Sequence, residues 1–217
     1  MSVAEAAARV RTRIEAAGGD LDRVRLLAVT KGQPASAITE AIDAGLLDLG
    51  ESYAQELARK AGDLDREVRW HFVGGLQRNK VRVVAPFVHL WQSVDRLSLA
   101  AEIARYAPGA ALLVQVNVSG LEHQSGCPPE RVAGVVEGCV DLGLNVRGLM
   151  AIGPRGTEAA VRAGFASVRE LADRLDLPER SMGMSGDLEA AVAEGSTMVR
   201  IGTDLFGPRG VASGVGQ

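Results

Sequence analysis

The chain has 217 residues, of which 47% are hydrophobic, and a formal net charge of −3. This length is enough for one large core, and the weak charge gives no electrostatic reason to expect nucleic acid or an anionic membrane as a partner. No apolar run approaches the ~20 residues of a membrane span, and the N-terminus lacks the apolar core of a signal peptide. The two cysteines, Cys127 and Cys139, form no CxxC pair, and the three histidines lack metal-ligand spacing. We therefore expect a soluble cytoplasmic protein without a disulfide scaffold or a metal site.

Short apolar runs alternate with amphipathic segments along the chain. A first helix, with Val3, Val10 and Ile14 on one stripe, precedes the first strand. Several later runs are almost continuously apolar, as is typical of parallel strands covered on both faces. Between the strands lie helices with apolar residues three and four positions apart, among them 132–140 and 161–175. The predicted strands are 25–31, 47–51, 69–74, 87–93, 111–118, 145–152, 181–185 and 196–202.

Eight β/α units in one chain predict a closed (β/α)8 barrel, a TIM barrel, whose usual length is ~250 residues. The first helix is an extra N-terminal element outside this count. A doubly wound open sheet is the alternative. Because no interdomain linker is visible, we expect one domain over residues 1–217, with the Gly-rich end from about 208 to 217 as a flexible tail.

Lys31 is the most informative residue because it ends an apolar strand, where an unpaired ammonium is costly. Lysine, unlike arginine, can lose its proton and attack an aldehyde. Side chains alternate along a strand, so Leu27, Val29 and Lys31 share one face. If the first two fill the barrel, Lys31 points inward at the C-terminal rim, where barrel active sites lie. The alternative is a rim lysine that reaches into solvent.

Arg200 is the second unusual charge, because it lies within the last predicted strand. Val199 and Ile201 suit the layer of helices, which turns Arg200 toward the barrel interior. A guanidinium in that place needs an acceptor. One interpretation is a structural ion pair with an inward acid such as Glu51, and the other is a role in binding a ligand.

Two loops near Arg200 offer an anion site. Gly202 and Thr203 form a turn with accessible backbone N–H groups, and Ser185 with Gly186 is expected to open the helix after the seventh strand. The alternative for Ser185 is an ordinary N-cap. Loops after strands seven and eight are the usual phosphate site of these barrels.

The combination of these features fits pyridoxal 5′-phosphate (PLP). The Lys31 amine would form the Schiff base, the two loops would hold the phosphate, and Arg200 would face the pyridine nitrogen. Other phosphate signatures, the GxxxxGK[ST] P-loop and the GxGxxG fingerprint, are absent from the sequence.

Long segments of the chain match a known family in the same order. They are 27–31, 50–56, 70–80, 115–118, 148–152, 181–187 and 195–203. With these segments the chain resembles the pyridoxal phosphate homeostasis proteins, whose barrel is similar to the N-terminal domain of alanine racemase. The resemblance covers nearly the whole chain.

The resemblance implies a protein of intracellular PLP homeostasis that holds PLP covalently and has no enzymatic turnover. PLP-dependent apoenzymes are the implied recipients. The residues that match the family's site are Lys31 for the Schiff base, Ser185, Gly202 and Thr203 for the phosphate, Arg200 for the pyridine nitrogen, and Asn117 and Met150 beside the ring.

Three positions depart from the family pattern. Ser52 stands where the family usually has Asn, and Thr30 replaces a usual Ser but keeps the hydroxyl. Gln124 stands where a Lys is common, which removes a positive charge from that loop.

A PLP-dependent amino-acid racemase is the alternative function. Similar racemases add a β-rich second domain, whereas a barrel uses essentially all 217 residues here. Racemisation also needs a base on each face of the ring, and Tyr53 is the one tyrosine expected near the rim. We therefore expect a binding protein, and a monomer, because no extended apolar stripe indicates an obligate dimer.

A phosphate-sugar isomerase on a similar barrel is a further possibility. It would use Glu51 as base and His71 as electrophile at the rim, but it would leave Lys31 without a role.

Overall fold

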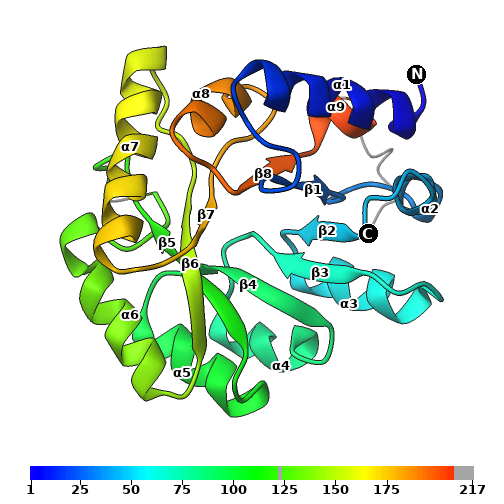
Figure 1. Cartoon of the computed structure of the whole chain (residues 1–217). Helices are drawn as coiled ribbons and strands as arrows, with labels where there is room; N and C mark the ends of the chain where they lie inside the picture. The colour runs from blue at the N-terminus through cyan, green and yellow to red at the C-terminus, as the bar shows by residue number, and fades with distance from the viewer. Residues whose placement is uncertain (122–123, 208–217) are drawn as a thin grey trace.

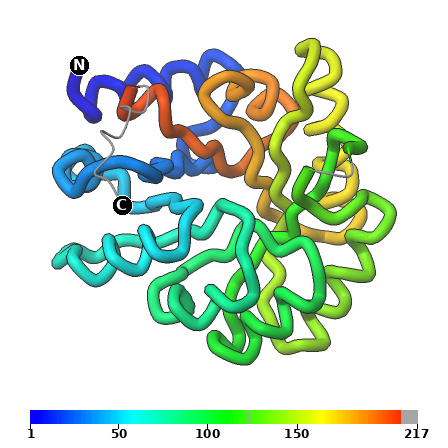
Figure 2. Tube along the Cα trace, turned by 180° about the vertical axis from the view of Figure 1, so that it is seen from behind, coloured from blue at the N-terminus to red at the C-terminus, as the bar shows by residue number. Residues whose placement is uncertain are grey.

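In the computed structural model, eight parallel strands follow one another around a closed barrel in chain order, and β8 is hydrogen-bonded to β1 (Figures 1 and 2). The structure describes residues 1–121 and 124–207. The predicted (β/α)8 barrel is confirmed, and the open-sheet alternative is wrong. The strands are β1 Arg25–Val29, β2 Asp48–Glu51, β3 Arg69–Phe72, β4 Val88–Val94, β5 Ala111–Val116, β6 Asn145–Ala151, β7 Glu179–Ser181 and β8 Met198–Ile201.

Helices surround the barrel and connect its strands (Figure 1). Two 3-10 helices, η1 and η2, precede α4 and α6. The predicted tail 208–217 and the histidine at position 123 lie outside the described residues. The helices are α1 Val3–Ala16, α2 Ala35–Asp43, α3 Ala54–Asp63, η1 Arg78–Lys80, α4 Val81–Val84, α5 Leu97–Tyr106, η2 Pro129–Arg131, α6 Val132–Asp141, α7 Glu158–Arg174, α8 Leu188–Ala193 and α9 Thr203–Phe206.

The predicted extra helix is α1, and it begins at a capping box. The Ser2 hydroxyl accepts a hydrogen bond from the Glu5 N–H at 3.2 Å, and the Glu5 carboxylate accepts one from the Ser2 N–H at 2.9 Å. Its apolar face is buried, as the stripe of Val10 and Ile14 predicts. This face packs α1 against α2, α8 and α9.

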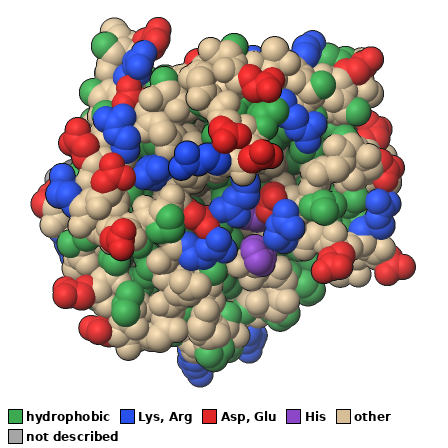
Figure 3. Space-filling view, viewed as in Figure 1, with side chains coloured by type: hydrophobic (Ala, Val, Ile, Leu, Met, Phe, Trp, Pro, Cys, Tyr) green, Lys and Arg blue, Asp and Glu red, His purple; other side chains and the backbone are tan. Residues whose placement is uncertain are grey.

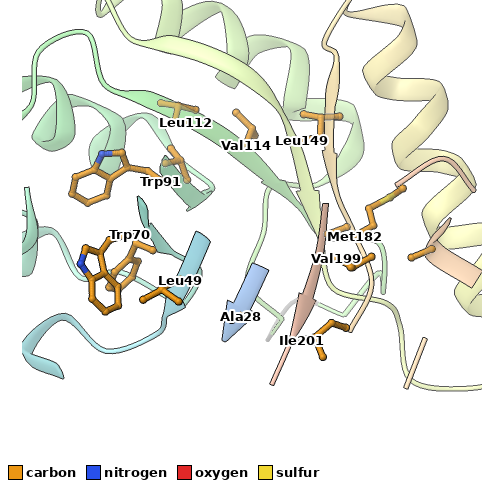
Figure 4. Packing of buried hydrophobic residues seen from close by; sticks show 14 of the residues in the cluster. Ala28, Leu49, Trp70, Trp91, Leu112, Val114, Leu149, Met182, Val199 and Ile201 are labelled. Carbon is orange, nitrogen blue, oxygen red and sulfur yellow. The ribbon is translucent and has the colours of Figure 1, made fainter. Parts of the chain in front are cut away.

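Two apolar layers follow from the alternation of side chains along the strands. The inner layer, inside the barrel, contains Leu27, Leu90, Leu113, Met150 and Met198. The outer layer lies between strands and helices (Figure 4). Labelled members of the outer layer in Figure 4 are Ala28, Leu49, Trp70, Trp91, Leu112, Val114, Leu149, Met182, Val199 and Ile201.

The strands that carry the predicted site end earlier than the sequence indicates. β1 ends at Val29, so Lys31 lies in the turn beyond it, and β7 covers 179–181 rather than 181–185. The chain still runs alongside β8 as far as Gly183, whose carbonyl accepts from the Arg200 N–H at 2.9 Å. Gly183 has φ 92°, a conformation that ends regular strand geometry and favours glycine.

No helix in the described part of the chain is long and apolar enough to cross a membrane. Within the same residues no three histidine, cysteine, aspartate or glutamate side chains are placed to share a metal ion. Cys127 and Cys139 are both buried and unpaired, and burial raises the pKa of the Cys139 thiol to about 11.

Candidate functional site

A cavity of about 370 Å³ opens at the carboxyl ends of the strands, where barrels build their active sites. Its volume lies in the range of ~300–1,000 Å³ that is usual for small-molecule sites. Five of the seven residues predicted for the site line it, from the loops after β1, β7 and β8 and from β8 itself. They are Lys31, Ser185, Arg200, Gly202 and Thr203.

Lys31 reaches the cavity from the turn after β1, where it is half-buried beside Val29. The backbone on both sides of it is held in place. Thr30 donates its N–H to the Gly50 carbonyl at 2.9 Å, and the Gly32 N–H donates to the Glu56 carboxylate at 2.7 Å. The segment that carries Lys31 is therefore held in place by hydrogen bonds on both sides of the residue.

A buried cluster of charges from α3 provides this anchoring. Lys60, 4% exposed, donates to the Thr30 carbonyl and to Glu51, both at 2.6 Å, and forms an ion pair with Glu56 at 2.7 Å. The Thr30 hydroxyl donates to the same Glu51 oxygen at 2.7 Å. Burial raises the pKa of Glu51, although the hydrogen bonds from Lys60 and Thr30 oppose the rise.

The position of Glu51 excludes one of the two interpretations that the sequence leaves open for Arg200. Glu51 faces Lys60 of α3, on the outer side of the barrel, and Gly50 takes the inner side against Leu27. The ion pair between Arg200 and Glu51 is therefore wrong. The direction was misjudged because β2 is short and has no apolar alternation to show which side faces inward.

Arg200 points into the barrel from β8, as predicted, and is 5% exposed. Its guanidinium donates to the Ser181 carbonyl at 2.6 Å, to the Ser181 hydroxyl at 2.8 Å and to the Ala151 carbonyl at 2.7 Å. Burial lowers the pKa of Arg200 to about 10, so the group stays protonated at neutral pH. Neutral oxygens, and no carboxylate, accept these three hydrogen bonds.

The predicted anion site lies where the turn before α8 meets the start of α9. Ser185 and Gly186 lie in that turn, and α8 begins only at Leu188, so the prediction that Ser185 opens the helix is wrong. Asp187 holds the turn by accepting the Met184 N–H at 2.6 Å. The predicted phosphate cup consists of Ser185, Gly186, Gly202 and Thr203, and these four residues line one part of the cavity.

The electrostatics of the cavity favour an anion. Among the described residues that line it, the charged side chains are Lys31 and Arg200, and both are cationic. Ser185 and Thr203 add hydroxyl groups, and a Cβ added at Gly186 would meet no atom within 4 Å. The backbone of the cup is thus open to a ligand.

Two predicted site residues lie elsewhere. Met150 is 1% exposed in the inner apolar layer and does not line the cavity. Asn117 borders a second cavity of about 200 Å³, and Ile152 lines both. The Asn117 amide donates to the carbonyls of Leu121 and Gln124 and accepts from Ser119, so it fastens its own loop.

Other lining residues were not singled out as site residues from the sequence. The sequence could have indicated them only by their position shortly after a strand. They are Gln33, Val73, Ile152 and Met184. Tyr53 is 58% exposed at the start of α3 and is not among the described residues that line the cavity.

A chain of hydrogen bonds continues from Arg200 through the barrel interior. The Ser181 hydroxyl donates to Gln92 Oε1 at 2.7 Å, and Gln92 Nε2 donates to His71 Nδ1 at 2.8 Å. His71 Nε2 then contacts Asp48 Oδ1 at 2.9 Å. Since the Gln92 amide nitrogen only donates, His71 Nδ1 accepts and Nε2 carries the proton given to Asp48.

The chain of hydrogen bonds from Arg200 ends at Asp48, which lies among ion pairs at the amino ends of the strands. Asp48 accepts two hydrogen bonds from Arg69, at 2.8 and 2.7 Å, while Glu179 pairs with Arg25 and Arg147. Burial alone would raise the pKa of Asp48, but the hydrogen bonds from Arg69 and His71 outweigh it and hold this pKa well below its usual value. Figure 3 shows basic, acidic and histidine side chains gathered near the centre of the face in view.

The fold and the cavity define a (β/α)8-barrel protein whose cavity at the carboxyl ends of the strands is lined by an amine, a buried guanidinium and two hydroxyl groups. The family model for the N-terminal domain of alanine racemase matches residues 4–210. The chain belongs to this family and, within it, to the pyridoxal phosphate homeostasis proteins. The resemblance inferred from the sequence is thereby confirmed.

Curated relatives match over nearly their whole length. The pyridoxal phosphate homeostasis protein of Pseudomonas aeruginosa is 46% identical, over 96% of this chain and 94% of the relative. The one from Aquifex aeolicus is 40% identical, over 96% of this chain and 99% of the relative.

Solved structures agree with this assignment. PipY of Synechococcus elongatus with PLP bound superposes with a TM-score of 0.84 at 36% identity, over 94% of this chain and all (100%) of that one. D-threo-3-hydroxyaspartate dehydratase from Delftia, at 18% identity and a TM-score of 0.70, shares the fold over 94% of this chain and 58% of that one.

Proposed function

We propose that this protein binds PLP, holds it covalently on Lys31 and serves intracellular PLP homeostasis without enzymatic turnover. One observation carries the proposal: Lys31 lines the same cavity as Arg200 and the phosphate cup. PipY, a relative of the same fold, has been solved with PLP bound, and curated relatives are named for PLP homeostasis.

The residues present fit this cofactor. PLP supplies an aldehyde that condenses with a primary amine, and a phosphate that carries about two negative charges at neutral pH. Lys31 offers the amine, and its anchored segment limits the directions from which that amine can approach. The cup offers hydroxyls from Ser185 and Thr203 and backbone N–H groups for the phosphate.

Arg200 is the proposed partner of the pyridine nitrogen. A guanidinium only donates hydrogen bonds, so it would keep that nitrogen unprotonated and weaken the ring as an electron sink. The Ser181 and Ala151 carbonyls fix its plane on the barrel side. Asn117 and Met150 stay predictions as neighbours of the ring, since neither lines the cavity in the described part of the chain.

The lining of the cavity supports binding over racemisation. A racemase needs a second base opposite the lysine. Among the described lining residues, Lys31 and Arg200 are the ionisable ones, and Arg200 is buried and protonated. Tyr53 lies on the exposed start of α3, and Tyr106 is half-buried against the core at the end of α5. We further propose a cytoplasmic monomer that passes PLP to PLP-dependent apoenzymes.

Covalent labelling tests the proposal. We expect the purified protein with PLP to show a visible absorption band, and borohydride followed by peptide mapping to place the label on Lys31. Lys31→Ala should lose both the band and the label, while Lys80→Ala, a matched change at a half-exposed lysine outside the cavity, should keep them. A label on Lys60 or Lys80 in the wild-type protein would refute the assignment.

Turnover is tested separately. The loaded protein is incubated with L-alanine in heavy water, and exchange of the α-proton is followed by NMR. We expect no exchange at turnover-like rates, and rapid exchange that disappears in Lys31→Ala would favour the racemase.

A further inference from the structure

Arg13, on the extra helix α1, contacts three separate parts of the structure around the phosphate cup. Its Nε and Nη2 bind both carboxylate oxygens of Glu189 on α8, at 2.7 and 2.9 Å. Its Nη1 contacts the Asp204 carboxylate, and its Nη2 also donates to the Ser185 carbonyl at 3.0 Å. One guanidinium therefore joins α1 to both loops of the cup.

The place of α1 makes this contact possible. The helix lies outside the eight β/α units, yet it runs beside α9 and packs on α8 in both views (Figures 1 and 2). Its buried face, which includes Val10 and Ile14, fixes the height and rotation of Arg13. The side chain is 33% exposed, so water is partly excluded from its ion pairs.

A hydrogen bond of 3.3 Å from the Asp204 N–H to the Ser185 hydroxyl also connects the two loops of the cup. Arg13 adds a rigid fork, because its planar guanidinium sets the relative positions of the Ser185 carbonyl and the Asp204 carboxylate.

Arg13 also changes the charge beside the cup. Asp204 directly follows Thr203, and an unpaired carboxylate there would repel a phosphate. The ion pair with Arg13 offsets part of this negative charge, because the same guanidinium also pairs with Glu189. Hydrogen bonding to Arg13 lowers the pKa of Glu189, and the pKa of Arg13 is raised in turn, as expected for a pair that is charged on both sides.

We propose that Arg13 is a positioning residue for phosphate binding: it holds the two loops of the cup at the spacing a phosphate needs and offsets part of the negative charge of Asp204. This inference rests on the proposed function, since it assumes that the cup takes the phosphate of PLP. The specific consequence is that Arg13 contributes to affinity for phosphorylated ligands and not to the reaction of Lys31.

The test compares three ligands on Arg13→Met. Pyridoxine 5′-phosphate carries the phosphate but no aldehyde, pyridoxal carries the aldehyde but no phosphate, and PLP carries both. We expect the variant to bind PLP and pyridoxine 5′-phosphate about tenfold more weakly, because the two loops would no longer be held together and the Asp204 charge would no longer be offset. Binding of pyridoxal, and the wavelength of the PLP absorption band at saturation, should stay as in the wild-type protein.

Two further variants control the comparison. Arg9→Met makes the same charge change one turn earlier on α1, at an exposed side chain, and should bind all three ligands like the wild-type protein. Arg13→Lys keeps the charge near Asp204 but cannot span the same acceptors, so its loss should be intermediate.

Equal weakening of pyridoxal and PLP in Arg13→Met would overturn the inference, because it would show a general loss of structure. So would phosphate-ligand affinities equal to those of Arg9→Met. Failure of the proposed function looks different: the wild-type protein itself would then bind none of the phosphorylated ligands, and the inference would fall with it. If the wild-type protein binds pyridoxine 5′-phosphate without labelling of Lys31 by PLP, the covalent assignment fails and the Arg13 inference is judged on pyridoxine 5′-phosphate alone.

Discussion

The chain is poor in lysine, with Lys31, Lys60 and Lys80 among 24 basic residues, and two of the three serve the same loop. Lys31 enters the cavity, and Lys60 holds the backbone just before it. An ammonium group suits the second task because its three protons point in different directions. They meet one carbonyl and two carboxylates at 2.6 to 2.7 Å, an arrangement that a planar guanidinium would not match.

Removing the charge of Lys60 should therefore destabilise the protein. Lys60→Met keeps the length of the side chain but leaves Glu51 and Glu56 without their cation. Loss of one partner from a buried ionic cluster costs about 3–5 kcal/mol, and we expect a fall of that size in the free energy of unfolding, measured by urea denaturation. Lys80→Met, at a half-exposed position in η1, should change it by less than about 0.5 kcal/mol. Equal stability of the two variants would contradict the prediction.

Residues whose role follows from their sequence neighbours could be predicted, whereas residues whose role depends on a partner far away in the sequence could not. Lys31 is visible because a charge interrupts an apolar run, and Arg200 because its neighbours Val199 and Ile201 fix the direction of its side chain. Arg13 is hidden because its partner Asp204 lies 191 residues away, in a helix-to-helix contact that no local pattern indicates. The inner or outer direction of Glu51 is hidden for a different reason: its partner Lys60 is only nine residues away, but β2 is too short to show an apolar alternation.

At the scale of elements, the closure of the barrel depends on a close contact between β6 and β7. Gly148 pairs with Glu179, and a Cβ added at Gly148 would lie 1.9 Å from the Glu179 carbonyl oxygen. That atom belongs to the backbone of the neighbouring strand, so it cannot move without displacing β7. Since β7 leads into the Ser185 turn, the spacing of these two strands also affects the cup.

Gly148→Ala should separate the two strands. We expect a loss of about 1–3 kcal/mol or more in the free energy of unfolding, the usual cost of overpacking, measured by urea denaturation. The matched control is Gly134→Ala in α6, where an added Cβ meets no atom within 4 Å. There the same substitution should stabilise the protein by about 0.5–1 kcal/mol, because alanine is the better helix former. A lower free energy of unfolding for Gly148→Ala together with a higher one for Gly134→Ala would separate the effect of strand contact from that of helix propensity.

The types of element were predictable throughout, and their ends were less so. All eight strands appear in their predicted order because their apolar runs are long and the turns between them are marked. The error is largest at β7, where Gly183 turns the chain although the apolar pattern continues to Met184. Barrel sites are built from loops after strands, so the least predictable residues are also those that form the cavity.

At the scale of the whole molecule, the hydrogen-bond chain connects the two ends of the barrel. It runs from Arg200 at the cavity through Ser181, Gln92 and His71 to Asp48 at the amino ends of the strands. Each group donates in the same direction, so a change at one end alters what the other end can accept. Barrel interiors are usually filled by layers of apolar side chains. In this barrel the side chains of the hydrogen-bond chain occupy part of that space.

His71 makes this path sensitive to pH. It is fully buried, and burial lowers its pKa, although the hydrogen bond to Asp48 opposes the shift. The folded protein therefore keeps His71 neutral at a pH where the unfolded chain, with a histidine pKa of about 6.5, already binds a proton. Where the unfolded state binds more protons, stability rises with pH. His71 thus stabilises the protein least in acid, and this loss begins as the pH falls below about 6.5.

We expect the free energy of unfolding to fall by about 1 kcal/mol between pH 7.5 and pH 5.5 on account of His71, as measured by urea denaturation at both values. Asp48 contributes little to the difference between these two pH values. Its pKa is lowered in the folded protein, so its contribution to stability is lost only below pH ~4. His71→Gln can still accept from Gln92 and donate to Asp48, but it cannot titrate, so it should lower stability at both pH values and remove most of the difference. His89→Gln, at an exposed histidine near Asp48 and Arg69, should leave most of the difference in place. A His71→Gln protein with the full wild-type loss would show that the pH sensitivity arises outside the barrel interior.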